Sequence, residues 1–397
     1  MDYEFSSREG SSLVQTEDSS FVQTNALERE TVAQPMKPQS LPFSRSYAAM
    51  REVDMSSCSS HIRRTLQGVD RIVVYSLPLV TRFRGVTIRE GLLLHGEYGW
   101  GEAAPFVEYG PQESSRWLFS AWQAACVAPP QVHADRVLVN VTIPVSSPEE
   151  AVQRVERSGG CATAKVKVAD PRTRLYDDCE RVEAVADALV RTVGQERARV
   201  RVDVNGAWDK DEAIRALAEL DRAASSVGGL EYAEQPCATV EELAYVRKAQ
   251  HVPIAADESI RRADDPMKVI RKQAADVAVV KVAPLGGYER TVDLAERTGV
   301  RVVVSSALES SVGLATGIRT AAYLMDQQEP VACGLATSQL LAADVTYQPL
   351  QVAEGFLPVT PIEPYEEAIG KKPLPDGTYD RWVSRLGDMC AYMEAFS

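Results

Sequence analysis

The sequence of 397 residues lacks the patterns of several common classes of protein. Its four histidines are isolated, and its seven cysteines are scattered and never spaced as CxxC, so neither a zinc site nor a disulfide framework is indicated. No apolar run approaches the roughly 20 residues that span a bilayer. No GxGxxG follows the first strand-like run, which argues against a dinucleotide-binding fold.

The sequence also has fewer basic than acidic residues. The 43 basic residues stand against 56 acidic ones, and the net charge of −13 argues against a general role in binding nucleic acid or an anionic membrane. The N-terminus, MDYEFSSREG, lacks the basic region of a signal peptide. We therefore expect a cytoplasmic protein that acts on a small molecule; the sequence does not indicate its oligomeric state.

Composition divides the chain into four parts. Residues 1–66 are rich in Ser, Gln, Thr and acidic residues, which predicts a disordered extension or a start assigned too early, upstream of Met50 or Met55. Residues 67–135 contain strand-like runs and the helical pattern PQESSRWLFSAWQAAC, which predict a small α+β unit. Residues 346–397 end in an amphipathic helix that is expected to pack back on this unit.

The remaining part, residues 136–345, alternates apolar strand-like runs with helical segments that have a polar face. Such alternation predicts parallel strands joined by crossover helices, and eight units in about 200 residues are typical of a (β/α)₈ barrel. A doubly wound open sheet would give similar spacing. The expected strands are 137–145, 163–168, 200–204, 230–233, 253–256, 277–282, 302–306 and 331–335.

Three successive expected strands end in a carboxylate: Asp203, Glu234 and Asp257. In a barrel these strand ends meet at one rim. Three anions at one place repel unless a cation lies among them, and hard oxygen ligands without His or Cys select Mg²⁺, with Mn²⁺ as a substitute. The alternative is that they are solvated loop carboxylates or helix caps.

Lysines occur inside two of the apolar runs. Lys165 and Lys167, in AKVKVAD, are two residues apart and so lie on the same face of the second strand. Lys281 lies on the sixth strand, nearly opposite across a barrel. A lysine beside another cation becomes a usable base, and this set suits removal of a proton next to a carboxylate. A solvent-facing lysine pair on an edge strand is the alternative.

Together these residues resemble the enolase superfamily, and within it the muconate-lactonizing subgroup, with KxK on strand two, acids on strands three to five and lysine on strand six. Stretches such as GWGEAAPF, EQPCATVEELA, KVAPLGG and SSALESSVG look like the o-succinylbenzoate synthase family in its actinobacterial form. The resemblance runs from about residue 70 to about residue 358. It implies a modified (β/α)₈ barrel whose α+β capping domain is built from the N-terminal region and the C-terminal segment.

The resemblance also implies roles for individual residues. The Mg²⁺ ligands would be Asp203, Glu234 and Asp257. Lys167 would be the base that returns its proton to the departing hydroxide, Lys281 the cation that stabilises the enediolate, and Lys165 the assistant of Lys167. Among the substrate-binding residues, Ser305 and Gly334 would contact the succinyl arm, and Arg84 would lie on the loop of the capping domain that closes the site.

The implied reaction is dehydration of 2-succinyl-6-hydroxy-2,4-cyclohexadiene-1-carboxylate to o-succinylbenzoate in menaquinone biosynthesis. N-acylamino acid racemase and muconate cycloisomerase remain alternatives, because relatives with the same residues catalyse those reactions. Dipeptide epimerases carry DxD on strand eight, whereas this chain has VACGLATSQ and no acid before Asp344. A metal-free enzyme with Lys281 as a Schiff-base nucleophile and a catalytically inactive binding barrel are further alternatives.

Overall fold

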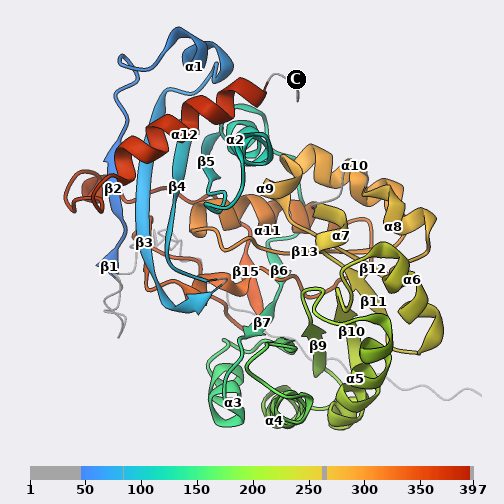
Figure 1. Cartoon of the computed structure of the whole chain (residues 1–397). Coiled ribbons are helices and arrows are strands. Elements are labelled where there is room, and N and C mark those ends of the chain that lie inside the picture. Colours follow the sequence, from blue (N-terminus) through green and yellow to red (C-terminus); the bar gives the residue numbers. More distant parts are fainter. Residues whose placement is uncertain (1–45, 84, 262–265, 394–397) are drawn as a thin grey trace, which may run out of the picture. The chain divides into compact units, whose positions relative to one another are not determined.

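The computed structural model describes residues 46–83, 85–261 and 266–393. Its smaller part is an antiparallel sheet covered by helices (Figure 1). The strand order is β2-β3-β4-β5, and we propose that these strands and three helices form a capping unit, the cap. Its elements are β2 (Ala49–Glu52), β3 (Arg71–Phe83), β4 (Val86–Gly96), β5 (Gly99–Ala103), α1 (Ser60–Thr65), α2 (Pro111–Cys126) and α12 (Thr378–Met393).

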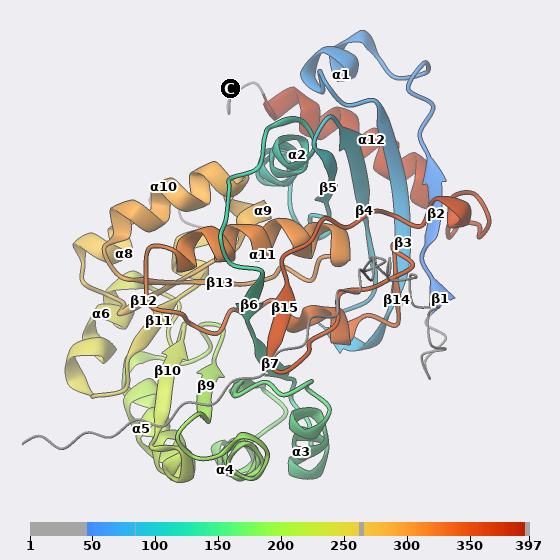
Figure 2. The ribbon, with the colours of Figure 1, turned by 180° about the vertical axis from the view of Figure 1, so that it is seen from behind.

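Helix α12 joins the far end of the sequence to the cap. Both views show it running along the sheet beside β3 and β4 (Figures 1 and 2). Arg381 of α12 donates a hydrogen bond to Glu90 of β4 over 2.7 Å. The buried face of α12 includes Trp382, Leu386 and Met389, which belong to the apolar core of the cap.

The expectation that residues 1–66 form a disordered extension is wrong for residues 47–66. Strand β2 pairs with β3, and Met50, opposite Tyr75, is fully buried. Val53, Ile62 and Leu66 are also buried in the cap core. These few apolar residues follow a long polar stretch whose average composition concealed them. Residues 1–45 lie outside the described part of the chain.

The larger part of the fold is a parallel sheet of seven strands in the order β13-β12-β11-β10-β9-β8-β7. This order follows the sequence step by step, as in a (β/α)₈ barrel. The strands are β7 (Asn140–Ile143), β8 (Thr163–Lys167), β9 (Arg199–Asp203), β10 (Leu230–Glu234), β11 (Ile254–Ala256), β12 (Val277–Val280) and β13 (Arg301–Val304).

The expected eighth strand is reduced to a two-residue link. Cys333 hydrogen bonds with the first strand region, through its N–H to Leu138 and its carbonyl to Asn140, at 2.8 and 2.9 Å. The N–H of Gly334 donates to the carbonyl of Val304 over 2.8 Å, and its carbonyl accepts the N–H of Ser306 over 2.9 Å, both in the seventh strand region. The link joins both edges of the sheet, so the ring of backbone hydrogen bonds closes before the chain turns into η2 (Ala336–Leu340).

Helices cross between the strands and cover the sheet, with polar residues capping their starts. Ser147 and Thr239 begin α3 and α6 with capping boxes, and Asp209 caps α5. No helix of the described residues is long and apolar enough to cross a membrane. The helices are α3 (Pro148–Glu156), α4 (Leu175–Val193), α5 (Lys210–Ala223), α6 (Val240–Ala249), α7 (Glu258–Arg261), α8 (Met267–Arg271), α9 (Val282–Leu285), α10 (Tyr288–Thr298) and α11 (Ser311–Met325).

Short elements complete the fold. The antiparallel pair β6 and β15 extends the first barrel strand region, and β1 pairs in parallel with β14. Two further 3₁₀ turns follow α5 and precede α12. These elements are β1 (Ser46–Tyr47), β6 (Arg136–Leu138), β14 (Ala343–Asp344), β15 (Phe356–Pro358), η1 (Ser225–Val227) and η3 (Glu366–Ala368).

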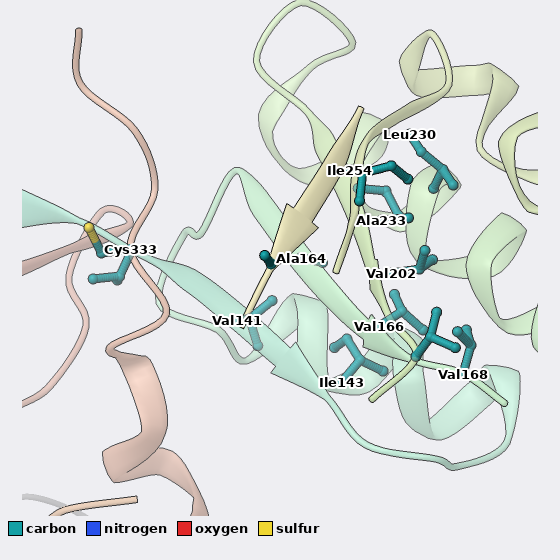
Figure 3. Close-up of a cluster of buried hydrophobic side chains, with 14 of the residues drawn as sticks. Val141, Ile143, Ala164, Val166, Val168, Val202, Leu230, Ala233, Ile254 and Cys333 are labelled. Carbon is teal, nitrogen blue, oxygen red and sulfur yellow. The ribbon is translucent and has the colours of Figure 1, made fainter. Parts of the chain in front are cut away.

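Side chains of the barrel strands alternate between the helices and the interior. Ala164 and Val166 of β8 belong to the apolar core that Figure 3 shows, together with Ile143, Val168 and Val202. Because neighbours along a strand point to opposite faces, the intervening Lys165 and Lys167 point into the barrel. The apolar core on one face of β8 thus fixes the direction of both lysines on the other.

Arg201 fills the barrel interior below the strand ends and is fully buried. Its guanidinium donates to the carbonyl of Ala332, to Asn140 and to Glu231, at 2.7, 3.1 and 2.6 Å. It also lies over the ring of Tyr232 at 4.6 Å. One side chain of β9 therefore contacts the first strand, the fourth strand and the residue just before the closing link.

The cap meets the barrel next to the end of the sixth strand. Gln123 of α2 accepts a hydrogen bond from the backbone N–H of Tyr288 over 2.8 Å. Gly287 precedes it with φ +104°, and a Cβ at Gly287 would lie 2.1 Å from the amide oxygen of Gln123. Glycine is thus required for this close approach of cap and barrel.

The burial of Met50 predicts that residues 49–52 contribute to stability. We expect Met50→Ala to lower the free energy of unfolding by about 2 to 5 kcal/mol, as is usual for a large buried side chain. Met55, which is only partly buried, is the matched control, and Met55→Ala should cost about 1 kcal/mol or less. Urea denaturation measures both; equal effects would contradict the burial of β2.

Candidate active site

The predicted site residues come from five consecutive strands and lie at the same rim. Strand register aligns Lys167 with Asp203 and Asp203 with Glu234. Asp257 follows β11 directly, and Lys281 follows β12 as the residue before α9. Because all these strands are parallel, their carboxyl ends bring the six charged groups to one mouth of the barrel.

The two lysines of β8 share one carboxylate oxygen. Lys167 Nζ lies 2.6 Å from Asp203 Oδ2, and Lys165 Nζ lies 3.3 Å from the same atom. Lys165 also contacts both oxygens of Glu234, at 3.1 and 3.0 Å. The like charges are therefore stabilised by anions between and beside them.

Asp257 is held by two cations on the other side of the mouth. Lys281 Nζ lies 2.5 Å from Oδ2, and Arg261 Nε lies 2.9 Å from Oδ1. Arg261 belongs to α7, one turn after Asp257, and its guanidinium also binds Glu258 over 2.6 Å. Lys281 therefore approaches the mouth from a different wall than Lys167.

Burial makes these charges strongly interdependent. Glu234 is fully buried, and burial together with the negative charge of Asp203 raises its pKa to about 7, against the attraction of Lys165. Burial has the same tendency for Asp203, but Lys167 and Lys165 outweigh it and hold the pKa of Asp203 below its ordinary value. For Lys165, the attraction of Glu234 and Asp203 outweighs burial and raises the pKa.

The three predicted metal ligands each contact a lysine rather than one another. In the described part of the chain, no three His, Cys, Asp or Glu side chains are gathered so as to hold a metal ion as they stand. Asp203, Glu234 and Asp257 nevertheless fit a divalent cation in their chemistry. They are buried carboxylates on neighbouring strands. Burial and the negative charge of Asp203 raise the pKa of Glu234, and a divalent cation would offset the repulsion between the two carboxylates.

A cavity of about 50 Å³ opens beside these charges. Ser305 and Gly334, predicted as substrate contacts, face each other across a backbone bridge and both line it. Arg84, the third predicted contact, lies outside the described residues. The other lining residues are Thr142, Lys165, Lys167, Asp203, Asn205, Glu258, Arg261, Lys281, Ser306, Ala307, Leu308 and Thr337.

Sequence reasoning missed two residues that organise the mouth. Arg261 was detectable only from its spacing, four residues after Asp257 on a short helix. Gln235, in the motif EQP, has φ +44° and is fully buried. Its side-chain oxygen accepts the backbone N–H groups of Asp257 and Ser259, at 3.1 and 3.2 Å, so it ties the end of β10 to the end of β11.

The bonds of Gln235 predict a large cost for removing its amide. Gln235→Met leaves two buried N–H groups without their acceptor, and we expect a loss of about 2 to 4 kcal/mol in the free energy of unfolding. Gln112→Met, at an exposed position of α2, should change it by about 0.5 kcal/mol at most. Chemical denaturation compares the two. A loss at Gln235 no larger than at Gln112 would contradict this role.

Two family models match the chain. Residues 147–364 match the "Enolase C-terminal domain-like" model, and residues 74–125 match "Enolase N-terminal domain-like". The first covers the barrel from α3 onward, without β7, and the second covers most of the cap sheet and α2. The expectation of a modified barrel with a capping domain is confirmed at the level of fold.

Curated relatives are similar over most of the chain. The o-succinylbenzoate synthase of Thermobifida fusca is 51% identical over 312 residues, which are 79% of this chain and 93% of that protein. The one from Mycolicibacterium smegmatis is 45% identical over 318 residues, 80% of this chain and 94% of the relative.

Solved structures agree in fold. A dipeptide epimerase from Enterococcus faecalis, determined with Mg and the dipeptide L-Leu-L-Tyr, superposes with a TM-score of 0.60 at 19% identity, covering 75% of this chain and 99% of that one. At this identity the likeness concerns the fold alone. The sequence relatives and the two family models together establish that the chain belongs to the enolase superfamily and, within it, to the o-succinylbenzoate synthases.

Proposed function

We propose that the protein removes water from 2-succinyl-6-hydroxy-2,4-cyclohexadiene-1-carboxylate to give o-succinylbenzoate, a step of menaquinone biosynthesis. The observation that carries the proposal is the pair of lysines, Lys167 and Lys281, that reach one buried mouth from different strands beside three carboxylates. The relatives that share about half of the sequence bear the name of this activity. The substrate is accordingly a small carboxylate.

Lys167 acts as the base. Its amine takes the proton from the carbon next to the substrate carboxylate, and the electron pair left behind spreads onto that carboxylate as an enediolate. The pair then forms the new double bond as the C–O bond to the hydroxyl breaks. The ammonium of Lys167 then gives its proton to the departing hydroxide, which leaves as water on the same face. Lys165, held between Glu234 and Asp203, keeps a positive charge beside Lys167 and assists it.

Lys281 is not needed as a base in this elimination. Held by Asp257, it presents a fixed positive charge where the substrate carboxylate gains negative charge during proton removal. Its placement on a different strand from Lys167 suits this division of roles. The same placement would suit a racemase that uses the two lysines on opposite faces, so N-acylamino acid racemisation remains the second candidate activity.

Enolase superfamily members generally use a divalent metal, and we propose Mg²⁺, with Mn²⁺ as a substitute, held by Asp203, Glu234 and Asp257. The E. faecalis epimerase was determined with Mg. When bound, such an ion supplies positive charge that stabilises the dianion formed by proton removal. The residues of this chain position the lysines beside it.

One alternative is made weaker by the position of Asp344. Its buried carboxylate accepts hydrogen bonds from the N–H and hydroxyl of Ser311 at 3.2 and 2.8 Å, and so caps α11. It is therefore engaged away from the cavity and does not supply the strand-eight acid of a dipeptide epimerase. The Schiff-base alternative requires no metal, and chelation distinguishes it.

The central test is an ultraviolet assay of o-succinylbenzoate formation by purified protein with Mg²⁺. We expect Lys167→Ala and Lys281→Ala to lower kcat by at least about 100-fold, because each removes a group that acts on the reacting atoms. Lys248→Ala, at an exposed position of α6, is the control and should match wild type. Wild-type protein that racemises N-succinylamino acids but forms no o-succinylbenzoate would overturn the proposed reaction. Full activity after EDTA treatment would overturn the proposed use of Mg²⁺.

The raised pKa of Glu234 predicts a pH dependence of metal binding. In the metal-free fold this pKa is about 7 instead of 4.5, so the proton stabilises the fold below pH 7 and that contribution is lost as the pH rises from about 4.5 to about 7. A divalent ion must displace this proton. We expect Mg²⁺ to raise Tm more at pH 8 than at pH 6.

Thermal scans with and without Mg²⁺ measure this difference. Glu234→Gln cannot bind the proton or ligate as an anion, so its Tm should respond little to Mg²⁺ at either pH. Equal Mg²⁺ effects at both values in wild-type protein would contradict the assignment of Glu234 as a ligand.

A further inference from the structure

The loop that follows β13, residues 305–310, forms one wall of the cavity. Ser305, Ser306, Ala307 and Leu308 all line it. Leu308 has φ +67°, a backbone conformation that is costly for a residue with a side chain, and it is almost fully buried. Such strain persists only where the surroundings hold it in place.

Contacts within the barrel restrain part of this loop. The hydroxyl of Ser306 donates to Glu309 over 2.5 Å and accepts the N–H of Leu308 over 2.8 Å. Thr337, from the segment after the closing link, donates to the same hydroxyl over 2.8 Å. These bonds involve side chains and N–H groups. The carbonyls of Ala307 and Leu308 are bound by a residue of the cap.

Arg89 of β4 binds both of these carbonyls. Its Nε donates to Leu308 over 3.0 Å and its Nη2 to Ala307 over 3.2 Å. Nη2 also donates to the carbonyl of Ala104, and the guanidinium lies over the ring of Phe106 at 4.0 Å. Arg89 is 3% exposed. The planar guanidinium is therefore fixed in the cap and binds the backbone of the barrel loop next to the strained residue Leu308.

Glu102 of β5 binds the other end of the loop. Its carboxylate accepts the N–H groups of Ser310 and Gly313, at 3.1 and 3.0 Å, as well as the hydroxyl of Ser310. Tyr75 of β3 donates to it over 2.7 Å and orients it. These N–H groups belong to the start of α11, where a negative charge is stabilising. The cap thus binds the same cavity wall with a positive charge at residues 307 and 308 and with a negative charge at residue 310.

We propose that Arg89 and Glu102 are positioning residues that set substrate specificity by holding the loop at residues 305–310 in its strained form. This proposal deepens the proposed function on which it rests. The loop carries Ser305, the predicted contact of the succinyl arm, so a shift of the loop changes how the arm is held without moving Lys167 or Lys281. The cap then influences the substrate through the barrel backbone as well as through any direct contact.

Arg385 of α12 offers a matched control. It is a partly buried arginine that also donates to backbone carbonyls, those of Pro105, Phe106 and Tyr109, at 3.1, 2.6 and 3.2 Å. All three carbonyls belong to the cap itself. Both Arg385→Lys and Arg89→Lys replace a guanidinium that binds backbone carbonyls. Arg385→Lys removes such contacts within the cap, whereas Arg89→Lys removes those between the cap and the loop.

The experiment compares the Mg²⁺-loaded wild type with the two lysine variants by steady-state kinetics and by hydrogen exchange of the peptide that covers residues 303–313. For Arg89→Lys we expect KM to rise about tenfold with kcat within about threefold of wild type, since the substrate arm loses its positioned wall while the lysines stay. Exchange at residues 308–313 should become faster. Arg385→Lys should leave KM and that exchange unchanged.

Glu102→Gln is the second variant, because it keeps the shape of the side chain and should reproduce both effects if Arg89→Lys does not fold. Unchanged exchange at residues 308–313 in the folded variants would overturn the proposal, as would faster exchange with unchanged KM. Failure of the proposed function would look different: the wild type itself would form no o-succinylbenzoate, whereas the exchange comparison would still report whether the two residues hold the loop.

Discussion

Mutual compensation of buried charge at the mouth of the barrel is the constraint on which the rest of the structure depends. Three carboxylates and two lysines are at least nine-tenths buried there and Lys167 is partly buried, so each charge at that depth needs a partner of opposite sign. The arrangement succeeds because parallel strands deliver each group at the same height. A side chain shifted by one residue would point to the helices instead, leaving its partner uncompensated.

The same constraint explains why so much of the surrounding structure is polar yet buried. Gln235 and Arg261 each satisfy groups that the strand ends cannot satisfy themselves. Arg89 and Glu102 perform the corresponding task for the cavity wall after β13. Cap and barrel therefore join through specific hydrogen bonds in addition to apolar contact, and such bonds fix orientation more narrowly than apolar packing does.

Sequence reasoning was most successful where a local pattern carries the geometry. Alternation around Lys165 and Lys167, and acids placed directly after apolar runs, define which face and which rim a side chain occupies. It failed where long-range contacts decide. Nothing near Arg89 indicates a partner more than 200 residues away, and the pairing of each lysine with its carboxylate depends on strand register. Residues 47–66 were misjudged because a few buried positions were averaged with a polar stretch.

Arg201 has a consequence for the order in which the chain assembles during synthesis. Its guanidinium, far inside the barrel, requires the carbonyl of Ala332 as well as Asn140 and Glu231. Until residues near 332 leave the ribosome, a nascent barrel would hold a buried cation with one acceptor missing, and the first and seventh strands would remain unjoined. Completion of the ring is thus a late event in translation, although most strands that form the mouth are made early.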